Sequence, residues 1–539
     1  MFPNFIFDKT KLPIFNPIHH VDGHNYHFPP PEIFTSGNEQ LPPLEDNSPV
    51  LVHANQQFEH HDLNTSLRPV YPERYHELLS SYQSKLKRFK DIIAIVDDEK
   101  ETEIESDGKL STVDIIELAA EKFIKFSTQK VNSNGYMTMF TNPYGSSLFS
   151  GLSIDDNREV ELVFQLLTAA ERVDRKQFEI ASKFLARCGC VASDDGTPVE
   201  RLVFYLCEAL QKRIGKETGI MAVPTKLKKP PAVKETNPMA VQTNMTFLAV
   251  HQAIPFTQVM QFAGIQAIID QVGMSKKVHL IDIHIQSGIH WAALMQASSE
   301  KKSQIELLKL TAFATLSDIQ KVGETGKRLE AFAATLNLPF VFKVLFLTDI
   351  SNVEEQQFEV EDGETIAVYC QMILRRMIWR PEKLENLIRA IKTINPSIIV
   401  LVEVEANHNS TSFVKRFTET LFFYGAMFDS LEACMSRDDA HRAKVESNHL
   451  AVGMQNIVAC EGDERNTRNV NIDTWRSFFM RFGMVEMDLS ESCLHQANLV
   501  LQQFSCGSFC TLENNGKCLI VGWKGIPVHS LSTWKFIEE

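Results

Sequence analysis

The residues best suited to acid–base chemistry are Glu403, Glu405 and His408, which lie within six positions of one another. Side chains alternate along a strand, so the two glutamates share one face and His408 follows near the carboxyl end of the predicted strand. Enzymes often place a general acid or base at such a position. The alternative is that these groups cap the following helix and bond loop backbone. We favour this alternative because no nucleophile motif or metal-ligand spacing lies nearby, and we predict no catalytic residues.

No residue spacing predicts a bound metal ion. His279 and His284 are five positions apart and lie on opposite faces of a strand, so a shared metal is not expected. We expect His279 to be a hydrogen-bonded core histidine instead. The chain has ten cysteines but no CxxC pair, which favours reduced, mostly buried thiols over a structural zinc site.

One segment resembles a phosphate-binding loop only in part. Gly326-Lys327 has the ending of such a loop, but Lys321 stands where the first glycine belongs. Arg328 also replaces the Ser or Thr that would bind Mg²⁺. We therefore predict the start of a helix here.

The turn after the first predicted strand does not suit a cofactor. In doubly wound sheets, ligands lie beyond the carboxyl ends of the strands. A dinucleotide or adenosyl-methionine needs several glycines there, so that the backbone can approach it. The turn after Asp282 has one glycine, Gly288, and the bulky Ile283 and Ile285 stand where small residues belong. We expect this pocket to be obstructed and predict no cofactor.

The elements that would position these residues alternate between strand and helix after Gly273. Such alternation, with nearly continuous apolar strands, predicts a parallel sheet covered on both faces. Near the end of the chain, an Asn514-Asn515-Gly516 turn between two apolar runs predicts an antiparallel hairpin. The fold class is therefore α/β, with a Rossmann-like (methyltransferase-like) core, a mostly parallel sheet and a C-terminal antiparallel hairpin. The predicted parallel strands are 278–283, 305–310, 340–346, 366–372 and 398–404, and the arms of the hairpin are 504–512 and 518–523.

An α-helical cap is predicted before the sheet. Its first helix begins at Ser111, and Asp114 lies at the spacing of a capping box. We place the cap at about 111–272 and the α/β core at about 273–539. The other predicted cap helices are 159–172, 175–188, 199–213 and 241–271.

The first part of the chain differs in composition. Residues 1–110 are rich in Pro, Asn and His and predict a largely disordered region, interrupted by a helix over 71–96 and ending in an acidic linker at 97–107.

The composition fits a soluble globular protein, with 44% hydrophobic and 23% charged residues. No apolar stretch reaches the roughly 18 to 20 residues that span a bilayer, and the N-terminus lacks the features of a secretory signal. We therefore expect the cytoplasm or the nucleus. The net charge of −14 repels a phosphate backbone, so tight binding to duplex DNA would need a segregated basic face.

Three long segments resemble the GRAS family of plant transcriptional regulators. VHLIDIHIQSGIHWAALMQA at 278–297 resembles the VHIID region of that family. VLVEVEANHNSTSFVKRFTETLFFYGAMFDSLEA at 400–433 resembles the PFYRE region, and LIVGWKGIPVHSLSTWKF at 519–536 resembles the SAW region. Because further similar segments lie between them in family order, we expect a GRAS domain over 111–539.

The resemblance implies an α/β core under a helical cap, no established catalytic activity, and regulation of transcription in the nucleus. The repeat at about 159–215 resembles a surface that pairs with other GRAS proteins, as a homodimer or heterodimer. Its candidate partner-binding residues, Val163, Leu166 and Leu167, form a near miss to a Leu-x-x-Leu-Leu recruitment box. The competing interpretation of these three residues is a packed helix face.

The resemblance also implies binding of zinc-finger or other DNA-binding transcription factors by the SAW end, with indirect contact to DNA and no membrane association. Trp523 and Trp534 would then be presented to the partner, although a buried strand tryptophan is the commoner case. The motif residues carried over by position are Val278, His279, Leu280, Ile281 and Asp282 in the VHIID motif; Glu405, Asn407, His408, Phe428, Asp429, Ser430, Leu431 and Glu432 in the PFYRE region; and Trp523, Gly525, Ser532, Thr533 and Trp534 in the SAW region.

Two positions depart from the family pattern. Met454-Gln455 stands where Arg-Glu is expected, so an ion pair made there by other members would be absent. Thr533 stands where alanine is usual. Both departures bear on contact residues and not on the fold.

Only short sequence segments indicate the branch of the family. The first hundred residues contain neither a DELLA nor a VHYNP segment, which argues against gibberellin-receptor control by that route, although the C-terminal part is DELLA-like. The ending CTLENNGKCLIVGWKG resembles members linked to root symbiosis with arbuscular fungi.

Two other functions compete with partner binding. One is direct, sequence-specific DNA binding, and the other, less favoured, is a methyltransferase-like small-ligand-binding protein. A solvated helix face is the competing interpretation of the basic residues that would contact DNA, which are Arg375, Arg376, Arg380, Lys383, Arg389, Lys392, Lys226, Lys228 and Lys229.

Overall fold

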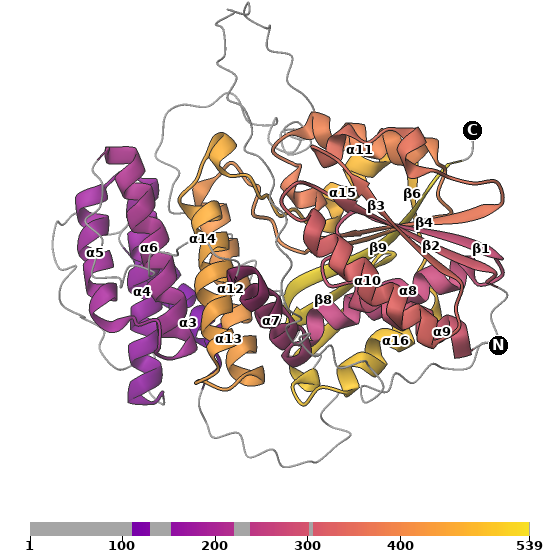
Figure 1. Ribbon diagram of the computed structural model, residues 1–539. Coiled ribbons are helices and arrows are strands. Elements are labelled where there is room, and N and C mark those ends of the chain that lie inside the picture. The colour runs from indigo at the N-terminus through magenta and orange to yellow at the C-terminus, as the bar shows by residue number, and fades with distance from the viewer. Residues whose placement is uncertain (1–109, 130–151, 220–237, 301–304, 538–539) are drawn as a thin grey trace, which may run out of the picture.

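The computed structural model describes residues 110–129, 152–219, 238–300 and 305–537. In these residues the chain forms a nine-stranded sheet with helices on both faces and, beside the sheet, a bundle of helices that we call the cap (Figure 1). The predicted N-terminal helix over 71–96, the acidic linker and the rest of 1–109 lie outside the described residues.

Five strands form the parallel part of the sheet, in the order β3-β2-β1-β4-β5. This order reverses between β1 and β4, as in doubly wound folds. The central strands are buried on both faces, which explains their nearly continuous apolar runs. The predicted Rossmann-like α/β class is confirmed. The parallel strands are β1 (Lys277–Asp282), β2 (Leu307–Ala314), β3 (Phe340–Phe346), β4 (Glu364–Gln371) and β5 (Ile398–Val404).

The antiparallel end of the sheet is larger than the predicted hairpin. The hairpin consists of β7 (Cys510–Asn515) and β8 (Cys518–Trp523), and the 11-residue β9 (Ile526–Phe536) lies between β8 and β5. The far half of β9 also pairs with the short β6 (Met484–Met487). The predicted first arm began six residues too early, because a 3₁₀ turn over Gly507–Phe509 precedes β7.

Helices cover both faces of the sheet (Figure 1). The helix predicted over 241–271 is two helices, α7 and α8, because Pro255 disfavours helical backbone at Ile254, which is extended at φ −111° and ψ 129°. One face carries α8 (Pro255–Val272), α9 (Ile289–Glu300), α10 (Ile319–Thr335) and α16 (Glu491–Gln502), and the other carries α11 (Pro381–Thr393) and α15 (Ile472–Met480).

The cap is assembled from two separate parts of the chain, which corrects the boundary expected at residue 272. α12 returns from the sheet and packs against the helices of the first part, whereas α8 belongs to the sheet. α12 buries 16 of its 22 residues, and a helix buried on nearly all sides lies between two layers. The cap helices are α3 (Thr112–Gln129), α4 (Ile154–Asp174), α5 (Phe178–Val191), α6 (Pro198–Thr218), α7 (Pro238–Ala253), α12 (Phe413–Cys434), α13 (Ala440–Val445), a π-helix (Glu446–Leu450) and α14 (Ala451–Val458).

Local capping fixes several helix starts. Ser111 and Asp114 form the predicted capping contacts, with the Ser111 hydroxyl 2.6 Å from the Asp114 carboxylate and the Asp114 N–H donating to Ser111 Oγ at 3.3 Å. Thr197 and Glu200 form a complete capping box at α6. These contacts satisfy N–H groups that have no partner inside the helix.

Candidate functional site

Glu403 lies on the face of β5 that is covered by α11 and α15, and its side chain is buried. Its Oε1 accepts the backbone N–H groups of Leu374 at 3.0 Å and Arg375 at 3.3 Å, where a short 3₁₀ helix (Leu374–Arg376) begins. Burial raises the pKa of Glu403 to about 7, against the opposing effect of Arg375. The carboxyl group therefore holds backbone, and it is not exposed to a substrate.

Glu405 and His408 also bond backbone and buried groups. Both oxygens of Glu405 accept the Ile472 N–H, at 3.1 and 3.2 Å, at the first turn of α15. His408 is fully buried with Nδ1 2.9 Å from Asn469 Nδ2, and burial lowers its pKa to about 3, so the ring is neutral. The capping interpretation is confirmed in kind. The helix predicted to be capped, α12, was wrong, because Ser412 is the N-cap of α12 and Glu405 bonds α15 instead.

Asp282, the last residue of β1, holds the following turn and α9 in place. Its Oδ1 accepts the His284 N–H at 2.9 Å, and its Oδ2 accepts the Trp291 indole N–H at 2.7 Å. His290 Nε2 lies 3.3 Å from the same Oδ2. The carboxylate is 0% exposed, so it cannot meet a ligand from solvent.

His279 is the hydrogen-bonded core histidine that its position predicted. Its ring contacts Glu364 at 3.0 Å and Thr311 at 2.8 Å, and burial lowers its pKa to about 4. Glu364 is also paired with the buried Lys309 at 2.8 Å. The other three residues of the motif, Val278, Leu280 and Ile281, are core residues of β1.

The turn that follows β1 is filled by protein side chains. Ile283 and Ile285 are each 1% exposed, as expected for an obstructed pocket. Gly288 has φ +68°, and a Cβ there would lie 2.8 Å from Thr325, so the turn packs directly on α10. Gly326 lies within α10, against the Phe342 ring, so the loop-like segment is helix; the helix begins seven residues earlier, at Ile319, and not here as predicted.

The described residues contain no group of three His, Cys, Asp or Glu arranged to hold a metal ion. Six of the ten cysteines are buried, and all ten are free thiols. None of the helices in the described ranges is long and apolar enough to cross a membrane.

Asp429 of α12 joins three distant parts of the chain. Its Oδ1 accepts the Thr112 N–H at 2.9 Å, at the start of α3. Its Oδ2 accepts the Trp523 indole N–H at 2.7 Å and pairs with Lys524 Nζ at 2.7 Å. Lys524 and Gly525 have φ of +45° and +83° and form the tight turn between β8 and β9. One carboxylate therefore fastens the cap to the antiparallel end of the sheet.

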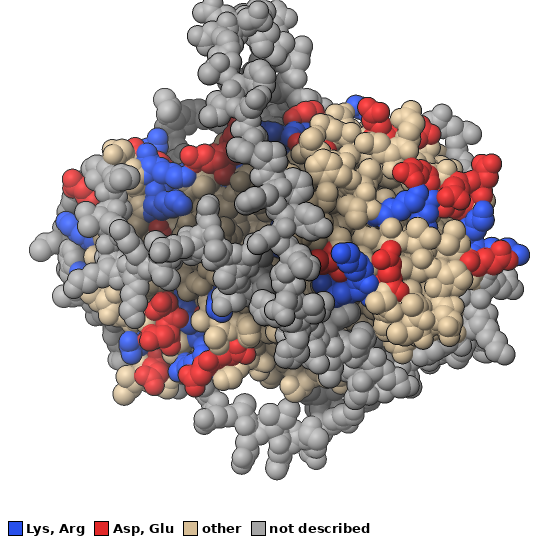
Figure 2. Space-filling model, viewed as in Figure 1, with Lys and Arg blue, Asp and Glu red and all other residues tan. Residues whose placement is uncertain are grey.

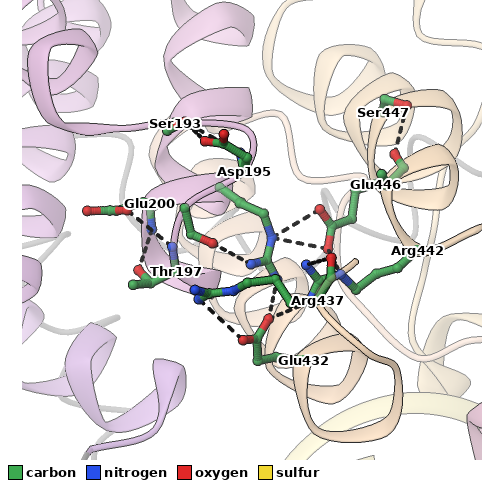
Figure 3. A network of polar contacts seen from close by, with 12 residues as sticks. Ser193, Asp195, Thr197, Glu200, Glu432, Arg437, Arg442, Glu446 and Ser447 are labelled. Carbon is green, nitrogen blue, oxygen red and sulfur yellow. Dashed lines mark hydrogen bonds and ion pairs between the residues drawn. The ribbon is translucent and has the colours of Figure 1, made fainter. Parts of the chain in front are cut away.

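A second polar network lies inside the cap (Figure 3). Arg201 of α6 is 1% exposed and pairs with Glu446 at 3.0 Å and Glu432 at 3.0 Å, while its Nη1 donates to the Gly196 carbonyl at 2.6 Å. Arg442 pairs with the same Glu432 at 2.5 Å. The network connects α6 to α12, α13 and the π-helix that begins at Glu446.

Known proteins are similar to this chain in sequence and in fold. Residues 162–535, more than half of the chain, match the GRAS domain family. The chain belongs to the GRAS family. This GRAS protein is 30% identical to DELLA protein RGL1 of Arabidopsis thaliana over 382 residues, which are 70% of each protein. It is 28% identical to DELLA protein GAI1 of Vitis vinifera, over 70% of this chain and 62% of that protein.

A solved structure shares the fold of this GRAS protein. The crystal structure of SCL7 from Oryza sativa aligns with a TM-score of 0.62 and 25% identity, over 69% of this chain and 99% of that one. Together with the DELLA relatives, the family places the chain among plant transcriptional regulators.

The candidate partner-binding residues of the GRAS repeat are not on the surface. Val163, Leu166 and Leu167 are each 0% exposed and pack within the cap. They cannot contact a partner directly while the cap is folded, so any such contact requires the opposite, solvent-facing side of α4 and its neighbour α5.

The SAW tryptophans are core residues as well. Trp523 is 0% and Trp534 1% exposed, and Trp534 donates to Ser532 Oγ at 2.9 Å. The expectation that they anchor a transcription factor is therefore wrong for these side chains, since each indole lies between sheet and helices. Of the remaining carried-over residues, Phe428, Ser430 and Leu431 are buried, Glu432 is partly buried, and Asn407 is exposed.

The departures from the GRAS pattern have local explanations. Met454 is 0% exposed, and Gln455 accepts a hydrogen bond from Lys212 Nζ at 3.0 Å, where glutamate would form an ion pair. Thr533 is buried on β9, and its hydroxyl donates to the Met487 carbonyl on β6 at 3.2 Å.

The basic stretch proposed for DNA does not form one free face. Lys383 pairs with Asp349, Arg389 pairs with Glu385 at 3.3 Å, and Arg380 stacks on Trp379 at 4.0 Å. On the side of the molecule shown in Figure 2, Lys and Arg are interspersed with Asp and Glu. Lys226, Lys228 and Lys229 lie outside the described residues.

Sequence reasoning missed the Arg201 network entirely. The only local signal was an arginine at an apolar position of α6, three residues after the Pro198 that begins the helix. Its partners lie more than 200 positions away, and no spacing rule connects them.

Proposed function

We propose that this GRAS protein works in the nucleus as a transcriptional co-regulator, binding other GRAS proteins through the outer face of its cap and DNA-binding transcription factors through its core. Contact with DNA is then indirect. The observation that carries the proposal is that the acids, bases and tryptophans of the family motifs hold the fold, and that all of them except the partly buried Glu432 are buried. Root symbiosis or hormone-linked development is the proposed programme, on the resemblance of the C-terminal segment.

The outer face of the cap supplies the surface for another GRAS protein. α5 is the outermost helix of the bundle, and it buries only a narrow stripe of Ala181, Leu185 and Cys188 (Figure 1). Ile180 on α5 is 37% exposed, and Ile154 at the start of α4 is 89% exposed. An exposed apolar side chain on either helix suits contact with a partner helix.

The SAW end offers a different aromatic residue to a transcription factor. Phe509 is 46% exposed, lies 5.6 Å from the buried Trp523 ring, and is covered on one side by Lys524 Nζ at 5.2 Å. We infer that Phe509 replaces the two tryptophans as the accessible aromatic contact at this end of the sheet.

The test is a pull-down with GRAS proteins expressed in the same tissue. Deleting 159–215 would remove core residues, so surface substitution is the sharper change. The double variant Ile154→Lys/Ile180→Lys is expected to lose these partners while keeping the melting temperature of the wild type. The control is Val452→Lys, because Val452 is 58% exposed on α14, away from α5. Full retention of every GRAS partner by the double variant would contradict the proposed surface.

A further inference from the structure

We propose that Arg375, Arg376 and Arg468 bind the phosphate group of a phosphorylated segment of a partner protein. The proposal deepens the proposed function by giving the chemistry of one partner, and it uses a surface separate from α4 and α5. A phosphoserine or phosphothreonine is the ligand class.

The backbones of the three arginines lie together at the carboxyl edge of the sheet. Arg375 and Arg376 follow the end of β4 directly, beside the point where the strand order reverses and doubly wound folds bind ligands. The backbone N–H of Arg468 donates to the Arg375 carbonyl at 3.1 Å, which fixes the third arginine beside the first. The glycine-rich backbone that would receive a nucleotide is absent from β1, so the arginines are the groups at this edge that can receive an anion.

The arginines have no acidic partner at ion-pair distance. Within the described residues, no carboxylate oxygen lies within 4.0 Å of the guanidinium nitrogens of Arg375, Arg376 or Arg468. Lys383 and Arg389, a few residues further on, are both paired with acids. Lys383 and Arg389 are therefore neutralised by neighbouring acids, whereas the three arginines are not.

Neutral oxygens hold two of the guanidinium groups in place. Arg375 donates to Asn469 Oδ1 at 3.1 Å and to the Met372 carbonyl at 3.4 Å. Arg468 donates to the carbonyls of Arg465 at 3.2 Å and Gly462 at 2.9 Å. These bonds orient the groups without cancelling their charge and leave further N–H donors available, since each guanidinium has five. Arg376 is exposed and makes no side-chain hydrogen bond among the described residues.

More positive charge lies behind this edge. Arg465 is 5% exposed and Arg416 is 1% exposed. One carboxylate, that of Glu461, forms ion pairs with both Arg416 and Arg213. Burial lowers the pKa of Arg465 and Arg468, and neighbouring arginines lower the pKa of Arg465 further. Glu403 and Asp318 raise the pKa of Arg376, and Asp463 and Glu461 raise that of Arg468, in each case from beyond ion-pair distance. A bound phosphate dianion would supply the negative charge that these arginines lack.

The surroundings favour one compact phosphate over duplex DNA. Glu461 and Glu464 are exposed next to Arg468, with 50% and 64% of their side chains accessible. Together with a net charge of −14, they repel an extended polyanion. Arginine clusters recognise phosphorylated side chains by charge-assisted, often bidentate hydrogen bonds.

The test measures fluorescence anisotropy with a labelled peptide that carries one phosphoserine among neutral Gly, Ser and Ala residues. The probes for comparison are the unphosphorylated peptide, inorganic phosphate as a competitor, and a labelled DNA duplex. The full-length wild type is expected to bind only the phosphopeptide, and inorganic phosphate is expected to displace it. Arg376→Gln and Arg468→Gln should each weaken binding roughly tenfold, and Arg389→Gln, whose arginine is paired with Glu385, should not.

Three results would overturn the proposal. They are no difference between the two peptides, an equal loss in Arg389→Gln, or tighter binding of the duplex through the same arginines. Circular dichroism is the check that the variants are folded, and Arg376→Gln should leave the core intact because Arg376 is exposed. The Ile154→Lys/Ile180→Lys variant should bind the phosphopeptide normally, which separates a failure here from a failure of the cap surface.

Discussion

Residues that do chemistry in enzymes serve here as fixed hydrogen-bond partners. Asp282, Glu403 and Glu405 each accept backbone N–H groups at a turn or helix start, and Asp429 accepts both a backbone and an indole N–H. A buried polar group is stable only when such bonds replace its hydration. These side chains therefore stabilise the fold through their hydrogen bonds.

Asp429→Ala tests this conclusion at the residue scale. The change leaves the Thr112 N–H and the Trp523 indole N–H without an acceptor, and it leaves Lys524 without its acid. We expect the free energy of unfolding to fall by about 2–4 kcal/mol in urea denaturation. Asp438→Ala, an exposed aspartate beyond the end of α12, is the control and should change it by less than about 0.5 kcal/mol. Equal effects of the two changes would show that Asp429 does not fasten the cap.

At the scale of elements, local pattern predicted each parallel strand, because each is a short apolar run bounded by helical stretches. β9 was missed because His529, Ser530, Ser532 and Thr533 are buried between strands on both sides, so the polarity of the segment hid its position. The break at Ile254-Pro255 had a clear local signal that was overlooked. No local signal predicted that the cap has two parts. Periodicity shows which face of α12 is apolar, but it does not show which layer of the molecule α12 joins.

Gly425→Ala tests how closely the two parts of the cap pack. A Cβ at Gly425 of α12 would lie 2.4 Å from Ile116 Cδ1 of α3, so the Ile116 side chain or the two helices would have to shift. We expect a loss of about 1–3 kcal/mol and a lower melting temperature. Gly189→Ala on α5 is the matched control, because nothing lies within 4 Å of the added Cβ and alanine favours helix, which predicts a gain of about 0.5–1 kcal/mol. A neutral Gly425→Ala would mean that the return of α12 is loosely packed.

At the scale of the whole molecule, buried titratable groups give stability a maximum in pH. The folded pKa values of Glu403 and Glu405, about 7, lie above the ordinary carboxyl value, so the unfolded chain loses these protons first and stability falls as pH rises from about 4.5 to 7. His279, His408 and His529, with folded pKa values of about 4, 3 and 3, lie below the ordinary value of 6.5. The unfolded chain therefore takes up these protons first, and stability also falls as pH drops below 6.5. From these groups we expect greatest stability near pH 6.5.

Glu403→Gln separates the carboxyl part of this dependence from the histidine part. Glutamine keeps the shape and one acceptor oxygen but cannot ionise, so the variant escapes the cost of a buried charge at high pH. Relative to the wild type, its free energy of unfolding should improve between pH 5 and pH 8, by at most about 3 kcal/mol. Urea denaturation at the two pH values measures the difference, and Glu382→Gln, an exposed glutamate of α11, should show the same difference at both. The contrary result is a difference in free energy of unfolding between Glu403→Gln and the wild type that does not change with pH. Glu403 would then be ionised throughout this range and paired with the nearby Arg375. Such a pair would also reduce the free charge at the proposed phosphate site.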